Sequence, residues 1–275
     1  MKRIVVAFLG CWLLFLENLS GAGENGKTKP LSFFFNGGVQ QYSYKEFAPQ
    51  EEGGGKLMEI SGMFWGVNAG ASLQYEWVEQ MIKVGYFQSL NTKYDGRIQN
   101  GDPYSGPSKD YYLLSEYHIL PYVFKSDVFV LKADLGLGYR FLHNLVQDAY
   151  RRSQHYAYFV AGLNGEKLLS KYLAVFTKLH YIGLIKGWHK TFLTDIGFDK
   201  DLNLTQEFGR GYRIELGLKR FLAHSMTLEL SLYYEFWNIG DSNFAYATDS
   251  QNKTDSFLEP RNHTNVYGVQ LGMKF

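Results

Sequence analysis

The sequence predicts an all-β fold: a single ten-stranded antiparallel up-and-down transmembrane β-barrel. Three observations predict it. Long segments alternate between apolar and polar residues, the connections alternate between short and long, and aromatic residues make up 17% of the 275 residues. Alternation at every second residue is typical of strands with one apolar and one polar face. In a barrel that spans a membrane, these faces meet lipid and lumen respectively.

The clearest strand spans 63–77. Every odd position from Met63 to Trp77 is apolar, and the even positions from Gly66 to Glu76 are polar or small. A strand of a water-soluble sheet averages about five or six residues. This segment is roughly as long as a tilted strand that crosses a bilayer. The length therefore favours a membrane barrel over a soluble sandwich, which also alternates but with shorter strands.

The alternation recurs along the chain, with connections of two kinds. The ten expected strands are 33–44, 63–77, 82–90, 111–120, 128–141, 155–163, 172–185, 211–220, 227–237 and 265–275. The short connections are 78–81, 121–127, 164–171 and 221–226, and the long ones are 45–61, 91–109, 142–154, 186–210 and 239–264. Short periplasmic turns and long extracellular loops are typical of such barrels.

Three regions follow from the pattern. Residues 1–22 are expected to be a secretory signal peptide, with an apolar stretch after Lys2 and Arg3 and cleavage after Ala22. Residues 23–30 form a polar N-terminal tail, and residues 31–275 form the barrel. The only cysteine falls within the leader, so the mature chain holds no disulfide and no cysteine-based metal site.

Composition excludes several classes of protein. The 28 basic residues nearly balance the 27 acidic residues, so no basic footprint for nucleic acid is present. A mean hydropathy of −0.24 argues against a bundle of membrane helices. No phosphate-binding loop is recognised, since the Gly53–Gly55 run does not link a strand to a helix. We expect no cofactor, no nucleic-acid partner and a monomer in outer-membrane lipid.

Charged residues fall on the expected inward faces. They are Lys83, Lys132, Arg140, Lys178, Arg213, Lys219, Lys274, Glu76, Glu116, Asp134, Glu215, Glu229 and Glu235. One register between 211–220 and 227–237 pairs Arg213 with Glu235 and Lys219 with Glu229 while apolar residues meet on the other face. A similar choice of register between 111–120 and 128–141 pairs Glu116 with Lys132.

We interpret these charges as an ionic core that locks a narrow barrel. Its expected members are Lys132, Glu116, Asp134, Arg140, Arg213, Glu215, Lys219, Glu229 and Glu235. The alternative interpretation is a narrow charged pore, whose near-neutral lining indicates no ion preference.

Two His–Asp combinations could in principle supply a general base. His118 and His180 share the inward faces with Asp134, where hydrogen-bonded lumen histidines are the plain interpretation. His189 and Asp195 fall in the expected outer loop 186–210, where nothing in the sequence sets their geometry. A hydrolytic site at the outer rim therefore stays an alternative, and no catalytic residue is assigned.

The same loop carries two further patterns. The segment 195–203 includes Asp199 and Asp201 in an order that begins like a calcium loop, but the later ligand positions do not fit. Asp201-Leu202-Asn203-Leu204-Thr205 also resembles the acid-extended sequon of bacterial N-glycosylation. Calcium binding and glycosylation of Asn203 are both left open, and no metal ligand is assigned.

The aromatic excess is expected at strand ends on the lipid face, where amphipathic rings form interfacial girdles. The residues placed there are Trp65, Tyr75, Trp77, Tyr139, Phe141, Tyr234, Phe236 and Phe275.

Three segments carry a resemblance to the small Gram-negative outer-membrane β-barrel proteins. They are the opening run from Gly37 to Glu46, the stretch 259–264, and the last strand, whose Tyr267, Val269, Leu271, Met273 and Phe275 look like the barrel-assembly signal. The resemblance spans about 31–275. It implies location in the outer membrane, passage by periplasmic chaperones and recognition by the barrel-assembly machinery.

The resemblance implies a fold and a location but no particular activity. Ten strands also invite comparison with the omptin surface proteases, but their acidic pairs and His–Asp dyad match no set of residues here. The function that we expect is non-enzymatic: a surface-exposed outer-membrane protein whose loops have a structural or contact role. A narrow porin and a rim hydrolase that is omptin-like or lipid-modifying are the alternatives.

Overall fold

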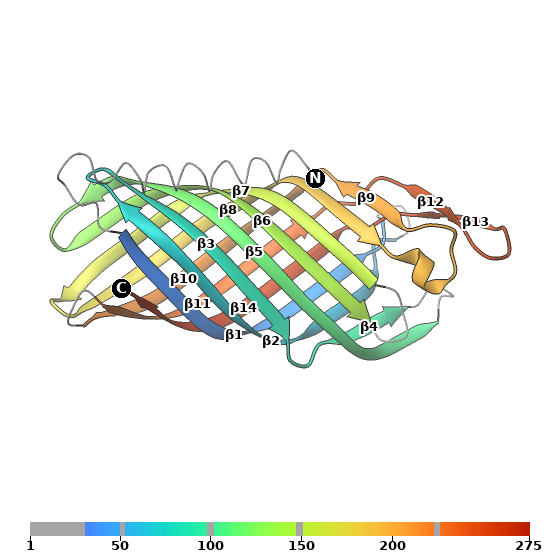
Figure 1. The fold of residues 1–275 in the computed structure, drawn as a ribbon, viewed down its shortest axis with the longest axis horizontal. Coiled ribbons are helices and arrows are strands. Elements are labelled where there is room, and N and C mark those ends of the chain that lie inside the picture. The colour runs from blue at the N-terminus through green and yellow to red at the C-terminus, as the bar shows by residue number, and fades with distance from the viewer. Residues whose placement is uncertain (1–30, 50–52, 98–101, 147–150, 223–225) are drawn as a thin grey trace.

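Ten antiparallel strands close into one barrel in the computed structural model (Figure 1), as the alternation predicts. The structure describes residues 31–49, 53–97, 102–146, 151–222 and 226–275, so the expected leader and tail lie outside the described residues. The barrel strands are β1 Leu31–Phe47, β2 Lys56–Gln74, β3 Val78–Ser89, β5 Pro103–Lys125, β6 Phe129–Val146, β7 Arg151–Ser170, β8 Leu173–Thr191, β10 Gly209–Phe221, β11 Thr227–Ile239 and β14 Asn262–Lys274. Closure comes from β1, which pairs with both β2 and β14.

Four short strands and one turn of helix extend the barrel at the end opposite the short turns. β4 (Lys93–Arg97) lies between β2 and β5, and β9 (Leu202–Gln206) pairs with β8. β12 (Ala245–Thr248) and β13 (Thr254–Phe257) form a separate hairpin, and the 3₁₀ turn η3 (Leu193–Ile196) precedes β9. Among the described residues, no helix has the length and apolar character needed to cross a bilayer.

The strands reach further than the alternation indicates, which corrects the expected loop boundaries. The sequence places 45–61 and 91–109 in loops, yet β2 begins at Lys56 and β5 at Pro103. Above the membrane both faces of a strand meet water or polar groups, so the apolar period disappears although the backbone pairing continues. The long extracellular loops are therefore largely an outward continuation of the barrel wall.

The register of β10 and β11 agrees with the sequence prediction. Arg213 lies opposite Glu235 and Lys219 opposite Glu229. The predicted pairing of Glu116 with Lys132 is wrong, because Glu116 lies opposite Gly138. Glu116 finds its cross-strand cation on the other neighbour, β3, where Lys83 lies opposite it. Charge pairing alone could not choose between the two neighbours of β5.

Aromatic rings form a belt on the outer surface of the barrel. Trp65 contacts Tyr86, Tyr86 contacts Tyr111, and Tyr111 contacts Phe141, with ring centroids 5.8, 6.2 and 5.9 Å apart. On the other side, Tyr234 contacts Tyr212 and Tyr267. Below this belt, the outward residues are apolar and exposed, including Leu135, Leu216 and Leu271. An apolar band under an aromatic girdle is the surface that a bilayer requires. Trp77, placed on the lipid face by the sequence, instead lies in the turn between β2 and β3, as does Tyr75.

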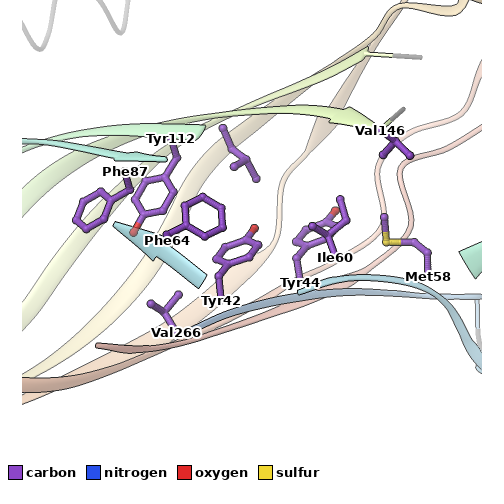
Figure 2. Close-up of a cluster of buried hydrophobic side chains, with 10 residues drawn as sticks. Tyr42, Tyr44, Met58, Ile60, Phe64, Phe87, Tyr112, Val146 and Val266 are labelled. Carbon is purple, nitrogen blue, oxygen red and sulfur yellow. The ribbon is translucent and has the colours of Figure 1, made fainter. Parts of the chain in front are cut away.

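The apolar core lies inside the outer half of the barrel. Figure 2 shows its side chains converging from opposite walls, with Tyr42 and Tyr44 from β1 and Phe64 from β2 facing Tyr112 from β5. The ring of Phe87 stacks on that of Tyr112 at 4.5 Å. Inward glycines make room for these rings: a Cβ at Gly66 would lie 2.0 Å from the ring of Phe87. A second cluster around Trp237 and Tyr158 completes the filling.

Candidate functional site

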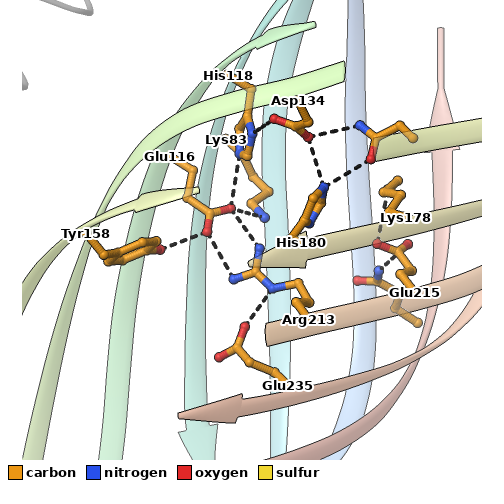
Figure 3. Close-up of polar contacts among 12 residues, drawn as sticks. Lys83, Glu116, His118, Asp134, Tyr158, Lys178, His180, Arg213, Glu215 and Glu235 are labelled. Carbon is orange, nitrogen blue, oxygen red and sulfur yellow. Dashed lines mark hydrogen bonds and ion pairs between the residues drawn. The ribbon is translucent and has the colours of Figure 1, made fainter. Parts of the chain in front are cut away.

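Charged side chains cross the lumen on the periplasmic side of the apolar core (Figure 3). Arg213 on β10 reaches β5, where its Nη2 lies 3.0 Å from Oε1 of Glu116. Its Nε also donates to Oε2 of Glu235 at 2.6 Å, and Glu235 lies 3.4 Å from Arg140 on β6. Lys83 forms a further ion pair with Glu116. The arrangement connects opposite walls of the barrel through buried charges.

A row of four titratable groups runs along the wall from Glu116. His118 Nε2 lies 3.4 Å from Glu116, and its Nδ1 lies 2.7 Å from Oδ1 of Asp134. The other oxygen of Asp134 lies 3.0 Å from His180 Nε2. The structure thus brings together the three residues that the sequence singled out on the inward faces. Among the described residues no group of three His, Cys, Asp or Glu side chains is placed to hold a metal ion.

A second set of ion pairs surrounds the periplasmic mouth. Glu79 pairs with both Lys132 and Lys274. Lys219 lies 2.7 Å from Glu166 and 3.4 Å from Glu229. On the neighbouring wall, Lys178 lies 3.1 Å from Glu215.

Glu79 and Glu166 also line the lumen, although the alternation predicts that both lie in turns. The strands β3 and β7 include them. Glu76, predicted to face the lumen, is exposed in the turn before β3. Tyr233 and Trp237 also point inward and line the lumen, so they do not belong to the aromatic belt on the outer surface.

Between these charged layers lies a cavity of about 450 Å³. Its mouth is lined by Lys125, Glu229 and Lys274 at the end of the short turns, and its far end by Tyr112 and Trp237. The aromatic core lies beyond Tyr112, on the extracellular side of the cavity. The lumen is therefore a vestibule on the periplasmic side and a packed interior on the other.

A separate polar cluster fills the lumen above the aromatic core, beyond the outer girdle. Glu259, which precedes β14, turns inward and accepts hydrogen bonds from Tyr44 Oη and Gln154 Nε2, both at 2.9 Å. Tyr44 Oη also lies 3.0 Å from Oε1 of Glu46, and Arg152 pairs with Glu46. Burial raises the pKa of the Glu259 carboxyl above its ordinary value, and the nearby Arg152 opposes part of that rise. The segment between β13 and β14 is tied by one side chain to β1 and β7.

His189 and Asp195, the residues considered for an alternative site at the outer rim, have different partners. His189 lies on β8, not in a loop, and is buried with Nε2 3.1 Å from Oε2 of Glu259. Asp195 lies outside and forms two hydrogen bonds of 2.8 Å with Arg151, which hold the pKa of its carboxyl below the usual value. The extra residue Ile185 makes a bulge in β8 opposite Ala157 and Tyr158, and it reverses the faces of the residues that follow. Parity counted from the start of β8 places His189 on the wrong face.

The segment predicted to begin like a calcium loop is organised differently. Residues 202–206 form β9, so the later ligand positions are in a strand. Asp201 accepts from Thr194 and pairs with Lys190 at 3.1 Å, and Asp199 accepts from the backbone N–H of Thr248. The carboxylates hold loops together and do not converge on one point.

Four of the five residues proposed as an assembly signal lie on one face of β14, and the fifth, Phe275, directly follows the strand. Tyr267, Val269, Leu271 and Phe275 are exposed on the outward side, and Met273 shares their parity. Phe275 exchanges two backbone hydrogen bonds with Phe33 of β1. The strand therefore presents an apolar outward row at the seam where the barrel closes.

Solved structures share this fold. The outer-membrane protease OmpT from Escherichia coli aligns with a TM-score of 0.62 and 9% identity, over 89% of this chain and 96% of that one. The chain has the fold of an outer-membrane β-barrel protein. The translocator domain of the autotransporter NalP from Neisseria meningitidis aligns over 99% of this chain and 97% of that one, with 13% identity and a TM-score of 0.43. No protein-family model and no characterised protein matches the sequence.

The closure of the barrel and its outward surface both place this protein in the outer membrane. The closed fold leaves no unpaired strand edge in lipid, and the apolar band lies beneath an aromatic girdle on the outward surface. At 9% identity the similarity to OmpT extends to the fold alone, so no catalytic residue is transferred from it.

Proposed function

We propose that this outer-membrane barrel is a closed, non-conducting and non-enzymatic surface protein whose ordered extracellular extension has a structural or contact role. The observation that carries the proposal is the filled outer lumen. Tyr42, Phe64 and Trp237 are each at most 2% exposed. The rings of Tyr42 and Phe64 lie 4.9 Å apart, and the ring of Trp237 lies 5.1 Å from that of Tyr158. Solutes that enter the periplasmic vestibule meet this layer before they reach the surface.

The extracellular end is built in a way that supports a role as a contact surface. Strands β9, β12 and β13 pack around a small apolar cluster of their own, built on Leu193, Leu202 and Ala247. The backbone N–H of Asn243 donates to Thr205 O, and that of Asp199 donates to Thr248 O, so the two long loops hold each other. A loop pair with its own core keeps one shape, which a contact surface needs.

Conductance tests the closed state directly. Refolded protein is inserted into planar bilayers, and we expect no current steps above the background of protein-free detergent. Discrete steps from the wild-type protein would overturn the proposal in favour of the narrow porin.

Hydrolysis assays test the non-enzymatic part. The purified protein is incubated with fluorogenic peptides and with phospholipid and lipopolysaccharide substrates, and we expect no turnover. Turnover that is lost on His118→Ala or Glu259→Gln, while the variant keeps its folded gel migration, would favour a hydrolase instead.

A further inference from the structure

The strand β9 carries a sequence pattern that the proposed role does not use. Asp201-Leu202-Asn203-Leu204-Thr205 contains an asparagine followed at the second position by threonine, with an acid two residues before it. An N-x-Thr sequence is an acceptor for N-linked glycans when it lies on the surface of an exported protein. We propose that Asn203 is an N-glycosylation site and that the protein carries an oligosaccharide on its extracellular face.

The alternation of β9 places the three recognised residues on one side. Leu202 and Leu204 are buried at 2% exposure and belong to the packed face of the strand. Asn203 is exposed, and residues two apart in a strand share a face, so Asp201 and Thr205 flank it on the same side. A glycan on Asn203 points away from the core that holds the loops.

Asn203 is also free to take a covalent group. Asp201 pairs with Lys190, and Thr205 Oγ1 donates to Asn243 at 3.0 Å. Within the part of the chain that the structure describes, the Asn203 side chain forms no hydrogen bond. A glycan at this position therefore costs the folded protein no contact.

Two other N-x-Thr sequences in residues 31–275 serve as internal comparisons. Asn262, followed by His263 and Thr264, is fully buried, so a glycan there is incompatible with the closed barrel. Asn252, followed by Lys253 and Thr254, is exposed in the β12–β13 turn but has Ser250 where Asn203 has Asp201. Only Asn203 combines exposure with the acid-extended pattern.

The chemistry requires a sugar donor of the polyprenyl-diphosphate-oligosaccharide class and a membrane-bound transferase. The amide nitrogen Nδ2 of Asn203 forms a bond to the anomeric carbon of the first sugar. The bond from that carbon to the phosphate oxygen breaks, polyprenyl diphosphate leaves, and an amide proton passes to a base of the transferase. Because Asp201 and Thr205 are occupied in the folded protein, the transfer precedes barrel assembly, while the chain is in the periplasm.

The test uses protein purified from the outer membrane of the bacterium that makes it. Cleavage after Lys200 and Arg210 releases the peptide 201–210, which holds Asn203. We expect this peptide to carry a saccharide mass, with fragment ions that locate the mass on Asn203, and the peptides with Asn252 and Asn262 to be unmodified.

Matched variants separate glycosylation from other modifications. Thr205→Ala and Asn203→Gln should each remove the added mass, whereas Thr205→Ser, which keeps the hydroxyl, should retain it. Asp201→Asn should lower the modified fraction. Finding only the unmodified mass of peptide 201–210 in the native protein, or a mass that survives Thr205→Ala, would overturn the proposal.

Discussion

Arg213 of β10 and Glu116 of β5 form an ion pair across the barrel, with Nη2 and Oε1 3.0 Å apart. Strands β6, β7 and β8 separate them along the wall, so the contact joins opposite sides of the cylinder and not neighbours. Glu116 is fully buried and also holds Lys83, and it accepts from Tyr158 Oη at 2.7 Å. The pair lies at the boundary between the vestibule and the packed lumen.

Removal of one partner of this pair should be costly. Arg213→Met leaves Glu116 and Glu235 short of a cation in a buried site, and we expect the free energy of unfolding to fall by about 3–5 kcal/mol. Urea titration in lipid vesicles measures it. The double variant R213M/E116Q should lose less than the sum of the single losses, and strict additivity would show that the pair does not interact.

The packing of rings onto glycines predicts a steric effect with a matched control. A Cβ at Gly138 would lie 2.1 Å from the ring of Tyr158, whereas at Gly165 the nearest atom is 3.6 Å away. Gly138→Ala should destabilise the barrel by about 1–3 kcal/mol, since an overpacked interior forces side chains out of place. Gly165→Ala should be close to neutral in the same unfolding assay. Equal effects of the two substitutions would contradict the packed lumen.

Opening of the aromatic layer should create a pore. Phe64→Ala and Trp237→Ala together remove two buried rings from the middle of the lumen, and we expect current steps in planar bilayers where the wild type gives none. Leu216→Ala and Leu135→Ala, which alter the lipid-facing surface, serve as a control pair and should stay silent. A silent F64A/W237A protein with folded gel migration would place the barrier elsewhere.

The buried Glu259 should make stability depend on pH. Its pKa is raised in the folded protein. The protonated form is therefore favoured by folding. Its contribution is complete below the ordinary value of 4.5 and is lost as pH rises through the raised pKa.

The measurement is the urea concentration at the midpoint of unfolding, taken from about pH 4 to about pH 9. Because the side chain of Glu259→Gln stays neutral, we expect its midpoint to fall less with rising pH than that of the wild type. Asp195→Asn provides the opposite control. Its carboxyl pKa is lowered by Arg151, so its contribution is present above the ordinary value and is lost as pH falls. An unchanged pH profile in E259Q would show that another group carries the dependence.

The end of the last strand should matter for assembly. Phe275 exchanges backbone hydrogen bonds of 2.8 and 2.9 Å with Phe33, and the two ring centroids are 6.2 Å apart. We expect Phe275→Ala to lower the heat-modifiable, folded fraction in isolated outer membranes, and Phe275→Tyr, which keeps the ring, to restore it. Normal yields of F275A would argue against a role of the terminal ring in assembly.

The sequence by itself determined the barrel, the strand number and the inward faces within the membrane. Lipid on one side and a polar lumen on the other impose a period of two, so residues such as Leu216 and Glu215 reveal their faces without any coordinates. The same period predicted the pairing of Arg213 with Glu235 in the β10–β11 hairpin.

Only the tertiary structure decided what fills the lumen and where the wall ends. On the extracellular side of the aromatic belt no lipid enforces the period of two, so the pattern predicts loops at Lys56 and Pro103, where strands in fact begin. The bulge at Ile185 reverses the faces beyond it and carries His189 inward, to Glu259. Contacts across a barrel, such as Arg213 with Glu116, depend on shear and curvature, and these leave no local pattern in the residues that they bring together.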